Sequence, residues 1–150
     1  MRVPMKKSKR LQPVVKVAEG REQQATQVLG DAQTKLAAAE QRLTELKTYR
    51  EEYIARFHAA GAAGMGAVRM EDYQNFLHKL ALAITQQVQL IAQAAKVVDE
   101  TRHLWHVSRS KVQMLDTVVS RYETEERRMV DRKEQGEQDE RSQRPAESKS

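Results

Sequence analysis

Three side chains come closest to forming a metal site. Asp99, His103 and His106 are spaced four and three residues apart, so on a helix they share one face. Two imidazoles and a carboxylate are ligands that zinc or iron accepts. No fourth ligand accompanies them, and the favoured interpretation is a solvated Asp–His pair beside Trp105, which is expected to pack in the core. We therefore expect no metal and no cofactor.

The segment Gly61–Gly66 holds three of the chain's six glycines. Glycine-rich loops can bind phosphate, but here no strand precedes the segment and no GK[ST] follows it. A chain reversal is the favoured reading, because glycine accepts positive φ. The 150 residues include no cysteine, which excludes thiolate catalysis and Cys-ligated metals, and no nucleophile–base set is present. We expect a protein that is not an enzyme and binds no small-molecule substrate.

The composition favours long helices over a compact globule. Apolar residues make up 39% of the chain, aromatic residues 5% and charged residues 31%, and there are three prolines. The most apolar window, 76–98, is interrupted by lysine, histidine and glutamine, so no transmembrane helix is predicted. No signal peptide is predicted either, because residues 11–18 lack a continuous apolar stretch. We expect a soluble, cytoplasmic protein.

The net charge of +5 is concentrated at the N-terminus. Residues 1–16 carry six bases and no acid, residues 17–122 sum to +1, and residues 123–150 sum to −2. Such a basic arm can contact nucleic acid, anionic lipid or an acidic protein surface. A solvated terminus that aids solubility is an equally good interpretation.

Apolar residues recur with a seven-residue period in two segments. The first series is Val15, Glu22, Leu29, Leu36, Leu43, Arg50 and Phe57, with Ala18, Ala25, Ala32, Ala39, Leu46 and Tyr53 three residues further on. Eleven of these thirteen are apolar, which predicts a coiled-coil helix. Glu22 and Arg50 interrupt the series. The favoured interpretation is that they fix the helix register, and the alternative is that a bound partner satisfies them. The second series is Met70, Leu77, Ile84, Ile91, Val98, Trp105, Val112 and Val119.

These patterns predict an all-α fold, a long antiparallel two-helix coiled-coil hairpin occupying residues 1–135. We expect helices over about 14–59 and 69–134, a loop over 60–68, and a disordered tail over 136–150. Pro13 is expected in the first turn of the first helix. The second helix is longer, so we expect its apolar residues from Leu115 to Val130 to protrude beyond the paired region and to dock another molecule, or to fray or self-associate.

Five of the seven aromatic residues flank the glycine loop. They are Tyr49, Tyr53, Phe57, Tyr73 and Phe76, and antiparallel folding brings them to one end of the hairpin. They are candidates for a docking surface, for closing the hairpin, or for both. The apolar stripe also widens between Tyr73 and Val98, where no acid occurs, so part of it is expected to be exposed.

The chain resembles the FliJ family, the coiled-coil component of the bacterial flagellar type III export apparatus. The resemblance rests on Tyr49-Arg-Glu-Glu-Tyr53, the glycine-bearing break, Asp72-Tyr-Gln-Asn-Phe-Leu-His-Lys-Leu80, Ala83-Ile84 and Trp105. It implies a monomeric hairpin like the two-helix stalk of the rotary ATPase γ subunit. It also implies a location in the cytoplasm, peripherally associated with the inner membrane at the flagellar base.

The resemblance further implies three partners: the export ATPase hexamer, the transmembrane export gate and free export chaperones. The hairpin would promote assembly and activity of the ATPase ring and couple export to the proton motive force. The family's gate-binding surface matches Leu46, Tyr49, Tyr53, Phe76, Leu80 and Ala83, while Arg42 and Gln87 depart from one familiar pattern at its edges. Candidates for binding the ATPase ring are Leu11, Val14, Val15, Leu115, Val118, Val119 and Tyr122, with the basic residues of 6–10.

Two other classes of protein fit parts of the pattern. A basic coiled-coil nucleic-acid binder would use the N-terminal arm, but it should also carry basic residues along a helix face, and residues 17–122 net only +1. A self-assembling scaffold is the third possibility. The glycine loop argues against it, because the loop gives each helix a partner within the chain.

Overall fold

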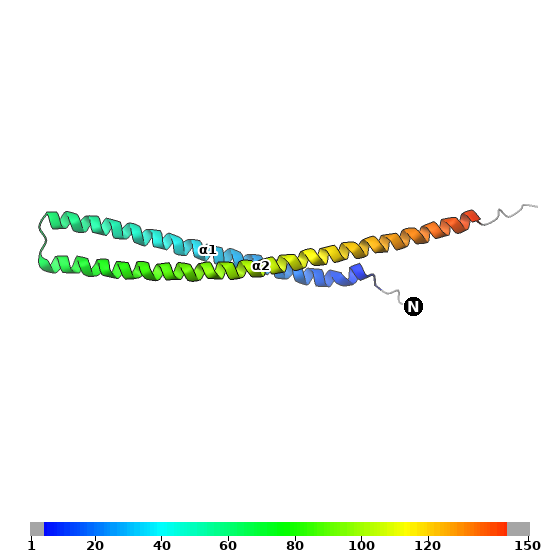
Figure 1. Cartoon of the computed structure of the whole chain (residues 1–150), viewed down its shortest axis with the longest axis horizontal. Helices are drawn as coiled ribbons and strands as arrows, with labels where there is room; N and C mark the ends of the chain where they lie inside the picture. The colour runs from blue at the N-terminus through cyan, green and yellow to red at the C-terminus, as the bar shows by residue number, and fades with distance from the viewer. Residues whose placement is uncertain (1–4, 144–150) are drawn as a thin grey trace, which may run out of the picture. The chain divides into compact units, whose positions relative to one another are not determined.

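The computed structural model describes residues 5–143, and 133 of these 139 residues are helical. Helix α1 spans Lys7–Ala62 and helix α2 spans Ala67–Gln143. The described part of the chain contains no strand. Figure 1 shows the two helices joined by a short loop. The predicted all-α, antiparallel two-helix coiled coil is confirmed.

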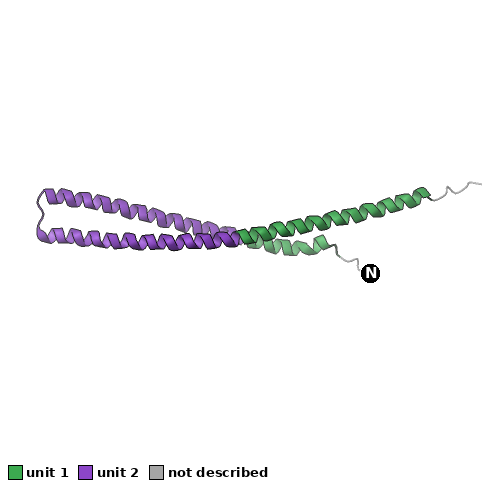
Figure 2. Cartoon of the chain, viewed as in Figure 1, with its two compact units in different colours: residues 1–23, 106–150 green, residues 24–105 purple. Residues whose placement is uncertain are grey.

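The chain divides into two compact units, each with one segment of α1 and one of α2 (Figure 2). Unit 2 is Gln24–Trp105 and contains the loop. Unit 1 combines residues 1–23 with 106–150, of which 5–23 and 106–143 are described. In unit 1 the antiparallel pairing is visible where Ser8 contacts Glu126 and where Val15 and Val119 line one surface hollow.

The core of unit 2 is a narrow seam between the two helices. Leu29, Ala32 and Val98 form its buried cluster, against which Leu36 and Trp105 pack. Alanine at every second seam position lets α2 approach α1 closely. No side chain of the described residues is completely buried, because a pair of helices can cover only one stripe of each.

Polar side chains within the seam find partners across or along it. Gln87 donates a 2.9 Å hydrogen bond to the backbone carbonyl oxygen of Ala39 on α1. The hydroxyl of buried Thr101 donates to the carbonyl oxygen of Val97 in its own helix, at 2.8 Å. Trp105 packs in the seam as predicted, and its indole Nε1 donates to Thr26 Oγ1 at 2.9 Å.

The chain reverses at the glycine-rich segment, as predicted, within a tighter loop than expected. Gly64 has φ of +93°, and its N–H donates to the carbonyl oxygen of Gly61 at 3.2 Å. This is how glycine commonly ends a helix, because a side chain at positive φ would clash with the backbone. The loop therefore occupies 63–66 rather than 60–68.

Helix α1 begins at Lys7, seven residues before the predicted start, so Pro13 lies inside the helix rather than in its first turn. Pro13 lacks the N–H that would bond to the carbonyl of Lys9. The residues before it are good helix formers, and Ser8 in the first turn is held by Glu126 of α2. These local and long-range contacts compensate for the missing bond.

Helix α2 continues to Gln143, beyond the predicted end at 134. The start of the predicted disordered tail, residues 136–143, is thus helical, and residues 144–150 lie outside the described residues. Glutamate, glutamine and arginine dominate this stretch and have high helix propensity, and one glycine, Gly136, lowers stability by only about 1 kcal/mol.

Two glycine substitutions near the turn are expected to have opposite effects. Gly64→Ala should lower the free energy of unfolding by about 1–2 kcal/mol, because alanine is strained at positive φ. Gly61→Ala should raise it by about 0.5–1 kcal/mol, because Gly61 is helical and has open space around it. Urea unfolding followed by circular dichroism measures both. Equal shifts in the same direction would contradict this account of the turn.

Candidate functional site

Five aromatic residues of unit 2 form one cluster at the loop end, as the sequence predicted. We call Tyr49, Tyr53, Phe57, Tyr73 and Phe76 the aromatic cluster. The ring centres of Tyr53 and Phe76 lie 4.4 Å apart, and the ring centres of Tyr53 and Tyr73 lie 5.0 Å apart. Tyr49 meets the ring of Phe76 edge-on, at 6.0 Å and 81°. The contacts cross from α1 to α2, so the aromatic cluster closes this end of the hairpin.

The aromatic cluster also presents a surface. Tyr49 is 42% exposed, whereas the other four rings are half-buried. Desolvation, followed by repulsion from the neighbouring Tyr73 and Tyr49, raises the pKa of the Tyr53 phenol. The rings thus exclude water from part of the cluster. Tyr49 remains available to another molecule.

The six candidate gate-binding residues come together in unit 2, but they do not share one environment. Leu80 is buried in the seam, and Leu46 and Ala83 are half-buried. Leu46, Tyr49 and Leu80 line a shallow groove whose rim is formed by Arg42 and Glu45. These two rim residues form a 3.8 Å ion pair. Sequence reasoning missed Glu45, although its spacing of three from Arg42 is the usual signal for such a pair.

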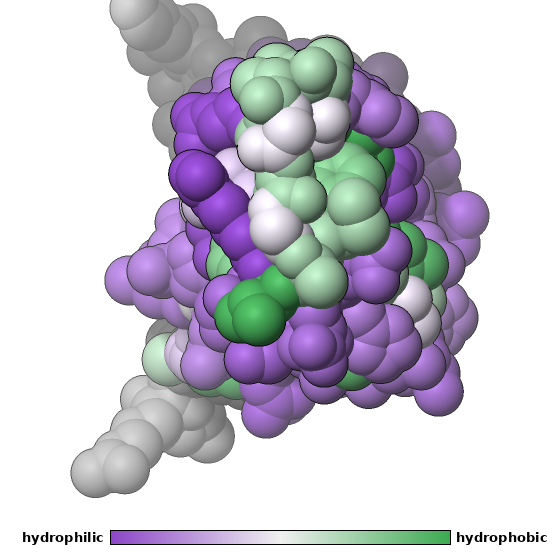
Figure 3. All heavy atoms as spheres, turned by 90° about the vertical axis from the view of Figure 1, so that its left-hand side faces the viewer, coloured by the Kyte–Doolittle hydropathy of each residue, from purple (hydrophilic) through white to green (hydrophobic). Residues whose placement is uncertain are grey.

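The tip of the hairpin carries a second apolar surface. Residues 59–68 contain no charged side chain, and Val68 is 75% exposed. Viewed from the loop end, an apolar strip runs down the surface between hydrophilic residues (Figure 3).

The candidate ring-binding residues lie in unit 1 and are more covered than expected. Because α1 begins at Lys7, it pairs with α2 as far as Glu126. Six of the seven candidates are half-buried in this pairing: Leu11, Val15, Leu115, Val118, Val119 and Tyr122. Val14 is 46% exposed. The predicted protrusion is therefore confined to the region beyond Glu126, where Met129 and Val130 are exposed.

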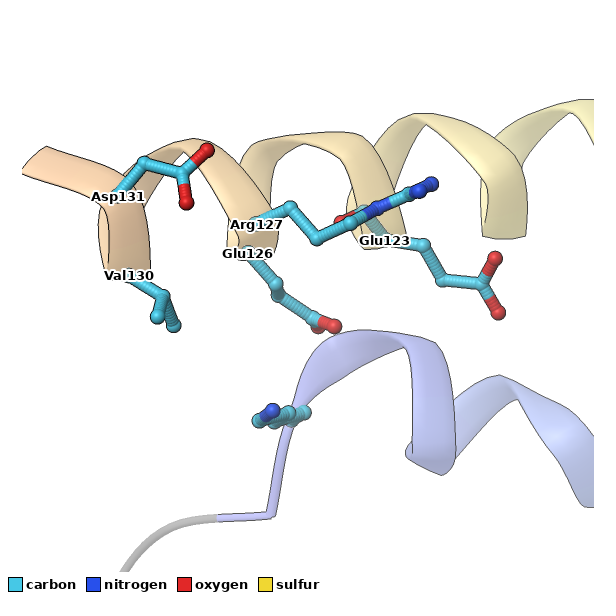
Figure 4. A pocket seen from close by; sticks show the side chains of 6 residues that line it. Glu123, Glu126, Arg127, Val130 and Asp131 are labelled. Carbon is cyan, nitrogen blue, oxygen red and sulfur yellow. The ribbon is translucent and has the colours of Figure 1, made fainter.

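A polar contact ends the paired region of unit 1. The Ser8 hydroxyl donates to the Glu126 carboxylate at 2.8 Å, and the Ser8 backbone N–H donates to it at 3.2 Å. Figure 4 shows Glu126 and Val130 pointing from α2 toward the first turn of α1. The hydrogen bond from the Ser8 side chain holds the pKa of Glu126 below 4.5. Glu126 continues the seven-residue series after Val119, which is the signal that sequence reasoning overlooked.

Basic side chains surround the same contact. Lys6 lines a surface hollow with Glu126, Val130 and Asp131, and the Lys7 ammonium lies 5.4 Å from the centre of the Tyr122 ring. Lys6, Lys7, Lys9 and Arg10 are all exposed. The open end of the hairpin thus combines a basic first turn of α1 with apolar residues of α2.

No metal or membrane-spanning feature emerges from residues 5–143. Among them no three histidine, cysteine or acidic side chains are grouped closely enough to hold a metal ion, so Asp99, His103 and His106 do not form such a site. Neither described helix has a stretch long and apolar enough to cross a membrane.

The Ser8–Glu126 contact predicts a pH dependence of stability. Glu126 has a lower pKa in the folded state, so below pH 4.5 the unfolded chain takes up its proton first. The stabilisation is complete above pH 4.5 and is lost as the pH falls through the lower folded-state pKa. Ser8→Ala should move the pKa of Glu126, measured by NMR, toward 4.5 and reduce this acid-side loss. Glu123→Gln, in the same hollow, is the control, and an unchanged pKa in Ser8→Ala would refute the assignment.

Comparison with known proteins places the chain in one family. The family model for the flagellar FliJ protein matches residues 6–149. The flagellar FliJ protein of Escherichia coli strain K12 is 30% identical over 130 residues, which cover 87% of this chain and 88% of that protein. That of Salmonella typhi is 26% identical over 136 residues, covering 91% and 92%. No solved structure matches. From the match over nearly its whole length, the chain belongs to the FliJ family of flagellar proteins.

Proposed function

We propose that this chain is a non-enzymatic component of the flagellar type III export apparatus that acts as the central stalk of the export ATPase ring. Family membership supports a role in flagellar export. The single observation that carries the finer proposal is the fold. Two helices packed along a seam offer an open surface hollow in unit 1 and another in unit 2, and the seam of residues 5–143 has no completely buried side chain.

The open end, in unit 1, is the part proposed to enter the ATPase ring. Its exposed cations, Lys6 to Arg10, can pair with acidic groups on the ring, and exposed Val14 supplies an apolar contact. The six half-buried candidate residues pack between the two helices and hold this surface in place. Differential contacts with the ATPase subunits would favour one of their states over another and so promote assembly and hydrolysis without covalent chemistry on the stalk.

The loop end, in unit 2, is the part proposed to contact the transmembrane export gate. Tyr49 is the most exposed ring of the aromatic cluster, and the uncharged tip, residues 59–68, begins ten residues further along the chain. Aromatic side chains bury a large area at low entropic cost, which makes them frequent hot spots. In this role the protein works at the cytoplasmic face of the inner membrane, couples export to the proton motive force and also binds export chaperones.

The stalk role is tested by the ATPase activity of the cognate flagellar export ATPase with and without this protein. We expect stimulation and more hexameric rings in electron micrographs. Val14→Glu should reduce the apparent affinity about tenfold or more, because a carboxylate is costly to bury in an apolar contact. Val107→Glu is the matched control, since Val107 is an exposed valine of unit 1 that is not a candidate and lies further from the open end. Absence of stimulation at stoichiometric excess would reject the stalk role.

The gate role is tested by motility of cells in which this chain replaces the native copy. Tyr49→Ala should abolish or strongly reduce motility while helicity is retained and thermal stability falls less than in Phe57→Ala, because Tyr49 is the cluster's most exposed ring. Phe57→Ala is the matched control. It removes a half-buried ring 5.5 Å from Tyr73, so it should lower stability but retain motility at permissive temperature. Motile Tyr49→Ala cells would contradict the docking role.

A further inference from the structure

The two sides of the hairpin in unit 2 are chemically different. On one side, positions spaced by seven on α1 run alongside positions spaced by seven on α2. The α1 row is Val28, Lys35, Arg42, Tyr49 and Arg56, and the α2 row is Arg69, Phe76, Ala83, Leu90, Val97 and Leu104. We call the space between the two rows the side groove. None of these eleven residues is acidic.

Contacts in the structure place the two rows on the same side. Tyr49 of the α1 row meets Phe76 of the α2 row at 6.0 Å. Arg42 and Tyr49 line one groove together with Leu80, a seam residue adjacent to the α2 row. In an antiparallel coiled coil, the position just before each residue of the two seven-residue series flanks the seam on one side. The other members of both rows hold this position, so they lie on the same side as Tyr49 and Phe76.

Beyond the aromatic cluster, the side groove exposes large apolar side chains. Val28 is 46% exposed, Leu90 51%, Val97 47% and Leu104 60%. They recur at steps of seven, so the three on α2 form one ridge about 21 Å long at 1.5 Å per residue. This ridge matches the apolar stripe of another helix in length and period.

The opposite side of the seam lacks these properties. Its rows are Thr26, Gln33, Glu40, Lys47 and Ile54 on α1, with Gln74, Ala81, Val88, Ala95 and Arg102 on α2. Val88 is its one large apolar side chain that is strongly exposed among these ten described residues. Glu40 is an acid within the row. The combination of apolar ridge and cations is therefore specific to the side groove.

We infer that the side groove binds an amphipathic α-helix of a partner protein, with an apolar stripe flanked by acidic residues, to form a three-helix bundle. The apolar stripe would pack on Val28, Leu90, Val97 and Leu104. Its acidic residues would pair with Lys35 and Arg42. Five carboxylates of this chain follow a residue of the seven-residue series by two positions, on the outer flanks of the groove: Asp31, Glu45, Glu52, Asp72 and Glu100. Glu45 already pairs with Arg42.

Charge complementarity decides for this occupant over a basic helix or a second copy. A basic helix would place its charges against Lys35 and Arg42. A second copy would bring Lys35 and Arg42 of one chain close to the same residues of the other, and like charges in close contact are unfavourable. The side groove includes three of the proposed gate-binding residues at its loop end. The residues proposed to contact the partner helix lie beyond them and belong to neither the gate-binding nor the ring-binding set, so the inference does not depend on the proposed function.

The test uses the full chain and two labelled synthetic helical peptides of about 21 residues, with leucine at the seam positions and either glutamate or lysine at the flanking positions. Fluorescence anisotropy should give a Kd of about 10 µM for the glutamate peptide and about tenfold weaker binding for the lysine peptide. Equal affinity for both peptides, or no binding of the glutamate peptide, would overturn the proposal.

Substitutions locate the binding site. Leu90→Gln with Val97→Gln should weaken binding of the glutamate peptide at least about tenfold. Leu82→Gln with Val88→Gln is the matched control, because Leu82 is 52% and Val88 49% exposed on other faces of α2. It should change the Kd less than about twofold. Equal weakening by both pairs, despite helicity retained by circular dichroism, would reject the side groove as the site.

A charge reversal tests the complementarity. Lys35→Glu with Arg42→Glu should reverse the preference, so that the lysine peptide binds more tightly, whereas Lys47→Glu on the opposite side should leave it unchanged. Sedimentation velocity of the chain alone tests whether a second copy occupies the groove instead. A dimer that is lost in the Leu90→Gln, Val97→Gln variant would assign the groove to a second copy and overturn the partner-helix proposal.

Discussion

The burial of one apolar stripe on each helix against the other is the interaction on which every other feature of this protein depends. Neither helix has another layer of structure to pack against within the described residues, so the seam supplies nearly all of the tertiary stabilisation. Seven hydrophobic residues are buried along it, and none completely. Burial of apolar surface scales with the area removed from water, so a seam this narrow stabilises each pair of turns only modestly.

A continuous apolar seam specifies pairing but leaves its register weakly determined, because each seven-residue step looks much like the next. Polar groups that cross the seam resolve this. Gln87 reaches the carbonyl oxygen of Ala39, Trp105 reaches Thr26, and Ser8 reaches Glu126. A slip by one heptad would leave the buried Ser8 and the half-buried Gln87 and Trp105 without these partners, which is unfavourable. The half-buried Glu22 and Arg50 interrupt the seam in a way that is consistent with the same role.

The seven-residue period was enough to predict the fold and nearly every covered position, because a coiled coil is a local pattern repeated many times. The ends were harder, because they depend on contacts distant in sequence. Pro13 suggested a helix start, but Ser8 and Glu126, 118 residues apart, hold an earlier turn in place. Gly136 suggested an end, but its neighbours favour helix strongly enough to continue to Gln143. The six candidate gate residues all lie in unit 2, yet sequence could not show that Leu80 is buried in the seam while Tyr49 is exposed.

The two sides of a helix pair need not be alike, and here the difference follows from what fills the space beside the seam. At the loop end, Tyr49 and Phe76 occupy flanking positions and meet across the helices, so the aromatic cluster fills the side groove there. One heptad away the corresponding residues are Arg42 and Ala83, and further on they are Lys35 and Leu90, which are too short or too strongly solvated to close it. The same row that stabilises the loop end therefore opens into a surface along the rest of unit 2. In a structure of two helices, a change of side-chain size within one row is sufficient to turn a packed position into an exposed one.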